Sequence, residues 1–516
     1  MSPISNLFPD NTIKLTPYAI VILTTVFSIL WYLFKRSPQP SLPPGPRGLP
    51  IVGNLPFLDP DLHTYFANLA QSHGPIFKLN LGSKLTVVVN SPSLAREILK
   101  DQDINFSNRD VPLTGRAATY GGIDIVWTPY GAEWRQLRKI CVLKLLSRKT
   151  LDSFYELRRK EVRERTRYLY EQGQKGSPVK VGDQLFLTMM NLTMNMLWGG
   201  SVKAEEMESV GTEFKGVISE ITRLLSEPNV SDFFPWLARF DLQGLVKRMG
   251  VCARELDAVL DRAIEQMKPL RGRDDDEVKD FLQYLMKLKD QEGDSEVPIT
   301  INHVKALLTD MVVGGTDTST NTIEFAMAEL MSNPELIKRA QEELDEVVGK
   351  DNIVEESHIT RLPYILAIMK ETLRLHPTLP LLVPHRPAEN TVVGGYTIPK
   401  DTKIFVNVWS IQRDPNVWEN PTEFRPERFL DNNSCDFTGA NYSYFPFGSG
   451  RRICAGVALA ERMVLYSLAT LLHSFDWKIP EGHVLDLKEK FGIVLKLKIP
   501  LVALPIPRFS DSNLYL

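Results

Sequence analysis

Hydrophobic and polar residues follow different patterns along the chain, and one stretch near the N-terminus is apolar throughout. Residues 15–34 carry no charged side chain and are rich in aliphatic and aromatic residues. About 20 such residues suffice to cross a bilayer as a helix. Lys35 and Arg36 follow at once and place that end in the cytosol. We therefore predict a membrane anchor over residues 1–36. A cleaved signal peptide is the alternative, but no small-residue cleavage site is evident.

The segment after the anchor is dominated by proline. Residues 37–48 hold too many prolines for a helix or a sheet, and they predict a stiff, extended hinge. No polar or low-complexity break interrupts residues 49–516. This continuity predicts one large catalytic domain rather than several small ones.

Within this domain, several stretches predict individual elements. Residues 79–81 and 87–89 are apolar runs flanked by glycine and proline, which predicts short strands. Residues 105–128 are mixed and contain glycine, which predicts a long loop. Residues 301–330 predict one long helix, although it contains Gly314 and Gly315. Each glycine costs a helix about 1 kcal/mol relative to alanine, so a packing or functional reason is expected.

Composition narrows the class of protein. Hydrophobic residues make up 43% of the chain and charged residues 24%, which is typical of a globular protein. The net charge of −3 argues against a dedicated nucleic-acid binder. No CxxC pair or zinc spacing occurs among the four cysteines, so a disulfide framework is not expected and a reducing compartment fits.

One cysteine lies in a stretch with a special pattern. Residues 447–456 read Phe-Gly-Ser-Gly-Arg-Arg-Ile-Cys-Ala-Gly, and a helical pattern begins directly after them. The glycines permit tight turns and close backbone approach. Cys454 would then lie near a helix N-terminus, where a thiolate is favoured as a metal ligand or a nucleophile. A buried structural cysteine in a glycine-rich turn is the simpler alternative.

This stretch resembles the haem-binding loop of cytochromes P450, Phe-x-x-Gly-x-Arg-x-Cys-x-Gly, with every fixed position present. The resemblance implies that Cys454 is the axial thiolate of haem b iron, a ligand that favours O–O cleavage. It also implies that Phe447, Arg452 and Gly456 contact the haem, with Arg452 near a propionate.

Further motifs of the family follow from the same resemblance. Trp134 and Arg138, four residues apart on one helix face, match the pair that binds haem propionates. His385 is implied to contact a propionate as well. Glu371 and Arg374 match the Glu-x-x-Arg motif. With Arg428, they imply a buried structural ion-pair network.

The glycine-containing helix resembles the helix that crosses the oxygen-binding face of the haem. Its Gly-Gly-Thr-Asp-Thr run implies that Thr318 is the hydroxyl near bound oxygen and Asp317 the acid of a proton relay. A hydroxyl can order water and a carboxyl can resupply protons, which oxygen activation requires. A simple polar kink in the helix is the alternative.

The residues implied to face the substrate are mostly apolar. They are Ile123, Val126, Val313, Gly314, Leu382, Val383, Ile493 and Val494. Because an apolar pocket gains by burying hydrocarbon and cannot pair many polar groups, it favours a mono- or sesquiterpenoid over a flavonoid with several hydroxyls. A flavonoid stays possible if Arg116, Thr119 or Asp124 reaches its polar rim.

Taken together, these motifs imply a mainly α cytochrome P450 fold with a small β region, preceded by one transmembrane helix. The wording of the motifs resembles plant microsomal enzymes, among them the cotton δ-cadinene hydroxylase group of terpenoid and flavonoid hydroxylases. The implied function is a haem-thiolate monooxygenase of the endoplasmic reticulum membrane that uses O2 and a small lipophilic substrate. Electrons would come from NADPH through cytochrome P450 reductase. The basic residues 135–149 would be its docking surface or merely a solvated face. An O2-independent haem-thiolate isomerase or dehydratase and a non-catalytic haem protein are the alternatives, and the complete oxygen-side motif argues against both.

Overall fold

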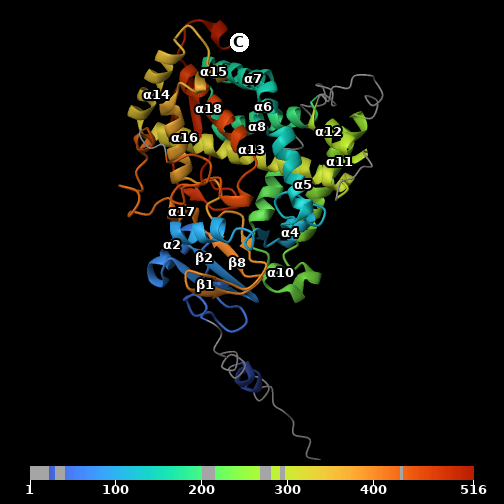
Figure 1. Ribbon diagram of the computed structural model, residues 1–516. Coiled ribbons are helices and arrows are strands. Elements are labelled where there is room, and N and C mark those ends of the chain that lie inside the picture. The colour runs from blue at the N-terminus through green and yellow to red at the C-terminus, as the bar shows by residue number, and fades with distance from the viewer. Residues whose placement is uncertain (1–21, 29–40, 200–215, 268–279, 291–296, 431–433) are drawn as a thin grey trace, which may run out of the picture.

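The computed structural model describes residues 22–28, 41–199, 216–267, 280–290, 297–430 and 434–516. Most of the domain is helical, and the strands gather mainly near one end (Figure 1). The helices are α2 (Leu62–His73), α3 (Pro92–Arg96), α4 (Leu113–Ala118), α5 (Ala132–Ile140), α6 (Arg148–Ser153), α7 (Tyr155–Gln174), α8 (Val181–Trp198), α10 (Val230–Phe233), α11 (Leu245–Met267), α12 (Phe281–Asp290), α13 (Ile301–Ser332), α14 (Pro334–Val347), α15 (Glu356–Ile359), α16 (Pro363–Leu375), α17 (Val408–Ile411) and α18 (Val457–Ser474). The strands are β1 (Ile76–Leu81), β2 (Lys84–Val89), β3 (Asn108–Arg109), β4 (Val179–Lys180), β5 (His385–Arg386), β6 (Thr391–Val393), β7 (Tyr396–Ile398), β8 (Lys403–Val406), β9 (Phe475–Lys478), β10 (Glu489–Lys490), β11 (Lys496–Leu497) and β12 (Val502–Pro507). The predicted class, mainly α with a small β region, is confirmed.

A five-stranded sheet joins parts of the chain that are distant in sequence. Its order is β1-β2-β8-β5-β3, and β1 pairs with β2 antiparallel, with Leu79 opposite Thr86. The two strands predicted at residues 79–81 and 87–89 are therefore confirmed. β2 pairs in parallel with β8, which comes from the C-terminal half of the chain.

The segment 105–128 differs from the predicted loop. It contains strand β3, which pairs with β5, and the short helix α4. Pro112 precedes the helix with an extended backbone. The mixed composition of the segment hid this change from extended backbone to helix. The segment is thus folded against the domain.

Helix α13 crosses the middle of the molecule (Figure 1). It begins with a reciprocal cap between Thr300 and His303, and the predicted single long helix is confirmed. A Cβ atom at Gly315 would lie 3.2 Å from the Thr193 hydroxyl oxygen of α8, whereas one at Gly314 would meet nothing within 4 Å. One glycine therefore permits close packing against α8, and the other leaves open space.

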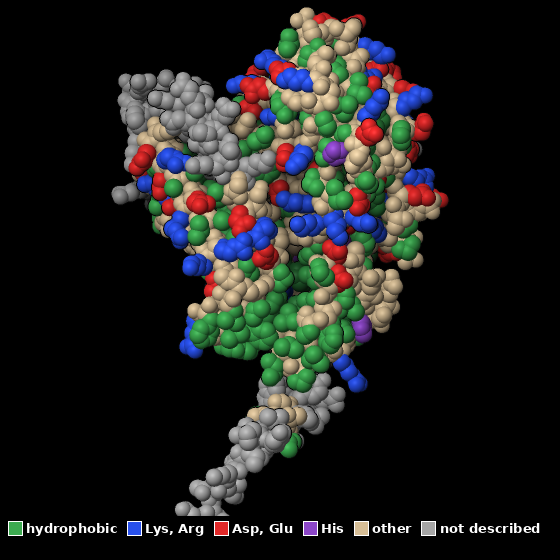
Figure 2. Space-filling view, turned by 180° about the vertical axis from the view of Figure 1, so that it is seen from behind, with side chains coloured by type: hydrophobic (Ala, Val, Ile, Leu, Met, Phe, Trp, Pro, Cys, Tyr) green, Lys and Arg blue, Asp and Glu red, His purple; other side chains and the backbone are tan. Residues whose placement is uncertain are grey.

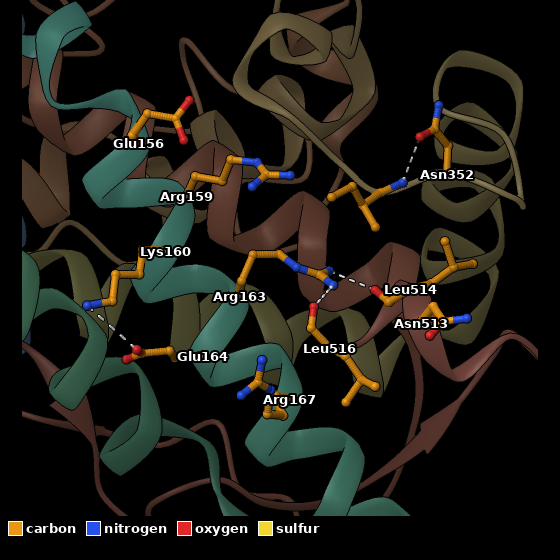
Figure 3. A pocket seen from close by; sticks show the side chains of 11 residues that line it. Glu156, Arg159, Lys160, Arg163, Glu164, Arg167, Asn352, Asn513, Leu514 and Leu516 are labelled. Carbon is orange, nitrogen blue, oxygen red and sulfur yellow. Dashed lines mark hydrogen bonds and ion pairs between the residues drawn. The ribbon is translucent and has the colours of Figure 1, made fainter.

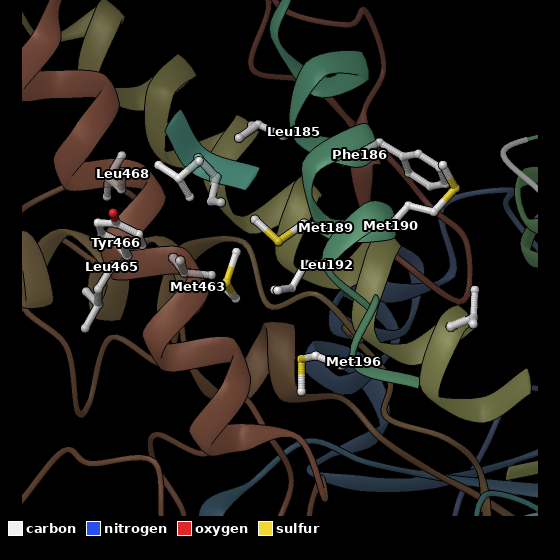
Figure 4. Close-up of a cluster of buried hydrophobic side chains, with 14 of the residues drawn as sticks. Leu185, Phe186, Met189, Met190, Leu192, Met196, Met463, Leu465, Tyr466 and Leu468 are labelled. Atoms are coloured by element: carbon white, nitrogen blue, oxygen red, sulfur yellow. The ribbon is translucent and has the colours of Figure 1, made fainter. Parts of the chain in front are cut away.

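The main hydrophobic core surrounds this helix. Helix α8 is buried on most of its circumference, as expected for a helix apolar nearly all round. Figure 4 shows Met189, Leu192 and Met196 of α8 extending toward Met463 of α18. Flexible thioether side chains fill such irregular space well.

The membrane prediction lies mostly outside the described residues. Only residues 22–28 of the predicted span are described, and they are helical. Among the described parts of the chain, no helix is both long enough and apolar enough to cross a bilayer.

Candidate active site

Cys454 is the last residue of a turn whose shape depends on two glycines. Gly448 and Gly450 have φ values of 75° and 68°, in the left-handed region that glycine tolerates. A Cβ atom at Gly450 would lie 2.0 Å from the carbonyl oxygen of Leu99. The Cys454 backbone N–H donates to the Phe447 carbonyl at 3.0 Å, and α18 begins at Val457, three residues after the cysteine. The turn therefore fixes the thiol just ahead of a helix.

The Cys454 thiol faces an internal cavity. The side chain lies deep within the fold, and the surface that it exposes forms part of the cavity wall. Gly314, Gly315 and Thr318 of α13 line the same cavity. Thioethers and leucines from α8 and α18 form other parts of the wall (Figure 4).

The surroundings of the thiol act on its pKa in opposite directions. Burial raises the pKa of Cys454, while the N–H of Gly456 and the charge of Arg138 lower it. The Gly456 N–H donates to Sγ at 3.3 Å. A bound cation would hold the sulfur as thiolate outright, since coordinating thiols deprotonate. The donor set thus suits a metal centre with one thiolate ligand.

Three arginines meet at one edge of this cavity. They are Arg109 of β3, Arg138 of α5 and Arg452 of the cysteine turn, and all three line it. Burial and the charges of Arg452 and Arg138 hold the pKa of Arg109 well below its usual value. Burial lowers the pKa of Arg452 to about 10. Within the described residues none of the three forms an ion pair with a carboxylate; all three donate to backbone carbonyls, and Nε of Arg109 has no hydrogen-bond partner.

Such an arrangement calls for an anionic partner. Buried like charges without counterions are costly, so a group with two carboxylates at this edge would neutralise them. The two propionates of a haem held by Cys454 would meet this requirement. The residues present therefore fit haem, and Arg109, Arg138 and Arg452 would hold its propionates.

His385 lies beside the same edge. Its Nδ1 is 2.7 Å from the carbonyl oxygen of Phe106, and burial together with the charge of Arg109 holds its pKa well below the usual value. Among the described residues Nε2 has no hydrogen-bond partner, and His385 lines the cavity, so this nitrogen is available to a ligand there.

Trp134 is placed differently from the prediction. It is not part of the cavity wall, and its indole N–H donates to the Ile125 carbonyl at 3.0 Å. The Arg452 guanidinium stacks over its ring at 4.3 Å and donates to the same carbonyl at 3.1 Å. The indole therefore supports Arg452 from behind.

The two residues of the predicted relay point in different directions. Thr318 lines the cavity, and its hydroxyl donates to the Gly314 carbonyl at 2.7 Å. Asp317 is absent from the cavity wall and is buried beside Lys496, whose Nζ lies 2.6 Å from Oδ2. Successive helical residues are about 100° apart, which separates the two side chains.

The predicted ion-pair residues lie together. Arg374 donates to both oxygens of Glu371, at 2.7 and 2.9 Å, and Nε of Arg428 donates to Oε1 of Glu371 at 3.1 Å. The remaining donors of both arginines reach backbone carbonyls of residues 412–423. Every charge in this group is paired within the chain.

The predicted substrate residues divide into two sets. Val126, Gly314, Leu382 and Val383 line the cavity, as does Phe447 of the haem loop. Ile123, Val313, Ile493 and Val494 are not among the residues that line it, and Val313 packs against the main core. The lining includes polar groups that the sequence interpretation omitted: Thr193, Asp310, Ser319, Thr322 and Thr378.

A buried acid pair beside the cavity also escaped the sequence analysis. Burial raises the pKa of Asp124 to about 6, and burial together with Asp124 raises that of Asp310 well above its usual value. Asp310 accepts from the N–H of Ile125 at 2.9 Å, which ties α13 to segment 105–128. Likewise, no pattern in the sequence indicated Arg109. In the structure its neighbour Asp110 binds Lys84.

A second hollow lies between α7, residues 352–353 and residues 513–516 (Figure 3). There Arg163 donates to the carbonyl oxygens of Leu514 and Leu516, both at 2.7 Å. Arg159 pairs with Glu355 at its rim. The cations of this hollow hold residues 514–516 in place. None of the residues that line the hollow also lines the cavity at the Cys454 thiol.

Comparison with known proteins agrees with this geometry. The sequence profile of the cytochrome P450 family matches residues 43–502. A flavonoid 3′-monooxygenase of Crocosmia x crocosmiiflora is 41% identical over 95% of this chain and 97% of its own. A flavonoid 3′-monooxygenase of Petunia hybrida is 40% identical over 95% and 98%. Carnosic acid synthase of Rosmarinus officinalis is 39% identical over 94% and 99%.

Solved structures share the fold. A zebra fish cytochrome P450 with abiraterone superposes with a TM-score of 0.72 at 27% identity, covering 87% of this chain and all of the other. The same holds for a zebra fish cytochrome P450 with progesterone, with a TM-score of 0.73 at 28% identity. The thiol, the cationic edge and the relatives agree: this chain belongs to the cytochrome P450 family and is a haem-dependent monooxygenase.

Proposed function

We propose that this monooxygenase hydroxylates the aromatic ring of a flavonoid. The observation that carries the proposal is the identity of about two-fifths, over nearly the whole chain, with several flavonoid 3′- and 3′,5′-hydroxylases. The terpenoid preference expected from the sequence is thus less well supported than its flavonoid alternative.

The chemistry of the cavity wall agrees with a phenolic substrate. The terpenoid prediction rested on an apolar pocket, whereas hydroxyls of Thr193, Ser319, Thr322 and Thr378 line the cavity. The Thr193 hydroxyl donates to its own helix and keeps acceptor capacity for a phenolic O–H. Polar substrate groups are therefore less costly to bury here than the sequence suggested.

The roles of the chain's residues follow from their positions. Haem, when bound, would supply oxygen activation: with two electrons from NADPH and two protons, one atom of O2 would enter a C–H bond of the substrate and the other would leave as water. Cys454 would hold the haem iron through its thiolate. Arg109, Arg138 and Arg452 hold the propionates and keep the ring oriented. Thr318 orders water in the cavity beside α13. Asp317, whose side chain lies outside the cavity wall, resupplies the protons.

The decisive experiment compares substrate classes. Full-length enzyme with NADPH–cytochrome P450 reductase is offered a flavone or flavanone with a free B-ring position and, separately, mono- and sesquiterpenes at equal concentration. We expect a ring-hydroxylated flavonoid and a substrate-induced shift of the haem absorbance. Turnover of a terpene, with neither shift nor product from any flavonoid, would contradict the proposal.

A substitution tests the relay role. Thr318→Ala should lower the product formed per NADPH by roughly tenfold and release hydrogen peroxide, because proton delivery loses its ordered water. Ser332→Ala, at the far end of the same helix, is the matched control. Unchanged coupling in Thr318→Ala would exclude Thr318 from the relay.

A membrane surface would hold the enzyme near its lipophilic substrate. Exposed apolar side chains gather at the end of the molecule that carries β1, β2 and α10 (Figures 1 and 2). They include Leu49, Ile51, Phe57, Trp236, Phe240 and Leu242. Such a patch suits insertion into lipid beside the anchor 1–36 and hinge 37–48. The predicted location is the endoplasmic reticulum membrane, with the domain in the cytosol.

The reductase would dock on the basic surface formed by α5, α6 and their connection. Arg135, Lys139, Lys144, Arg148 and Lys149 are all exposed on α5, α6 and their connection. A basic surface accelerates association with an acidic partner and weakens with salt. Charge reversal at Lys139 and Arg148 should slow electron transfer from the reductase without changing substrate binding.

A further inference from the structure

The carboxylate of Asp317 is fixed by a residue far away in the sequence. Lys496 of β11 donates from Nζ to Oδ1 at 2.9 Å, and the same ammonium is 2.6 Å from Oδ2. The Asp317 side chain is 6% exposed and that of Lys496 37%. The pair is therefore buried on the acid's side and open to water on the lysine's side.

The charge of Lys496 also acts on a second acid, with which it forms no ion pair. Glu324, seven residues after Asp317 on the same helix, is buried and accepts from the N–H of Leu501 at 3.0 Å. Burial raises the pKa of Glu324; the charges of Asp183 and Asp317 raise it further, whereas that of Lys496 lowers it. Within the described residues, neither Asp317 nor Glu324 forms an ion pair with any other cation. Removing Lys496 would leave two buried carboxylates on one face of α13.

The same lysine ends the turn that links β10 and β11. This turn, residues 491–495, is held at three points near the cavity. The Ile493 N–H donates to the Ser226 hydroxyl at 2.8 Å, and the Leu495 N–H donates to the Thr378 carbonyl at 2.9 Å. Phe491 stacks on His63 with a centroid distance of 5.4 Å. Thr378 lines the cavity, and its hydroxyl is 3.2 Å from that of Thr322 on α13.

We propose that Lys496 is a positioning residue for Asp317, which it holds on the β11 side of α13 and couples to the turn 491–495. Both oxygens of Asp317 lie within 3 Å of the Lys496 ammonium, so the carboxylate can pass a proton on only when this contact loosens. The exposed part of Lys496 marks where that proton enters from solvent. A movement of the turn on substrate binding shifts the ammonium and so reorients the acid. This inference rests on the proposed role of Asp317 in proton delivery.

The test uses full-length holoenzyme with reductase and five variants: Lys496→Met, Lys496→Arg, Asp317→Asn, the double variant Lys496→Met/Asp317→Asn, and Lys498→Met. Lys498 lies two residues along and is exposed, so it is the matched control. The CO-bound spectrum and thermal unfolding verify that each variant holds haem and folds.

We expect Lys496→Met to lower product per NADPH by roughly tenfold and to raise the solvent isotope effect on product formation. Lys496→Arg should restore most of the coupling, and Lys498→Met should match the wild type. Because Lys496 acts through Asp317, the double variant should resemble Asp317→Asn alone rather than multiply the two losses.

An infrared spectrum gives a readout without turnover. Loss of the cation leaves buried charge uncompensated, so Lys496→Met should show a stronger carboxylic-acid C=O band than the wild type and than the double variant, in which Glu324 remains but Asp317 does not. Normal coupling and no stronger band in Lys496→Met, with Asp317→Asn impaired, would overturn this inference alone. Normal coupling in Asp317→Asn would overturn the relay role and this inference with it.

Discussion

Two clusters of buried charge lie near the cysteine turn, and they differ in how they are neutralised. Glu371 with Arg374 and Arg428 forms a group in which each charge has an opposite partner at 2.7–3.1 Å. Arg109, Arg138 and Arg452 form a group of one sign that finds only backbone carbonyls. The first group is complete within the chain, whereas the second lacks anionic partners among the described residues, and bound haem would supply them.

The contrast separates the structural role from the cofactor role. A paired network contributes to the fold whether or not haem is bound. An unpaired cluster destabilises the protein before haem binds and stabilises the complex afterwards. Substitutions in the two groups should therefore have effects of different sign in haem-free protein.

The largest effect is expected for Glu371→Gln. It leaves two buried guanidinium groups without their carboxylate, which typically costs about 3–5 kcal/mol. We expect little folded holoenzyme and a much lower thermal midpoint in what is recovered, measured by CO-bound absorbance and circular dichroism. A midpoint equal to that of the wild type would contradict the structural role.

Arg109→Leu should affect haem binding before it affects folding. Losing one charged hydrogen-bond donor costs about 1.5–3 kcal/mol, so haem transfer to apomyoglobin should accelerate roughly tenfold or more. Haem-free protein should unfold at the same temperature or higher, because a buried unpaired charge is gone. Arg96→Leu, at an exposed pair with Asp101, is the control. A destabilised haem-free Arg109→Leu would show that the cluster is already neutralised by the chain.

The acid pair provides a pH test beside the arginine cluster. Because burial raises the pKa of Asp124 to about 6, the folded state binds a proton more tightly than the unfolded state. This group's stability contribution is therefore fully present at low pH and lost as pH rises through about 6. Asp124→Asn retains the acceptor for Trp127 and supplies a permanent donor toward Asp310. It should add about 1–3 kcal/mol at pH 7 and flatten the dependence between pH 4 and 6. An unchanged pH profile of urea unfolding would contradict the raised pKa of Asp124.

The smallest effect is expected at an exposed pair. Glu419 lies 3.8 Å from Arg425 with 81% of its side chain exposed. Glu419→Gln should change the free energy of unfolding by less than about 0.5 kcal/mol, because water screens such pairs. A loss comparable to that of Glu371→Gln would mean that charge count, rather than burial, governs this region.

Local patterns allowed much of this protein to be predicted. The cysteine turn, the long helix 301–332 and the Glu371–Arg374 pair depend on residues close together in the sequence, whose relative positions backbone geometry sets. Gly450 is an example, because its left-handed φ is a property of the turn itself. Helical spacing alone brings Glu371 and Arg374 together.

Tertiary packing decided the rest. Arg109 meets Arg452, and Lys496 meets Asp317, only because distant segments fold onto α13 and the cysteine turn. The sequence could not tell that Asp110 would bind Lys84 rather than Arg109, nor that Trp134 would support Arg452 from outside the cavity. It also could not set the rotation of α13, which turns Thr318 into the cavity and Val313 and Asp317 away from it. Spacing determined which side chains share a helix face, but only packing against α8, α18 and β11 determined which face looks onto the cavity.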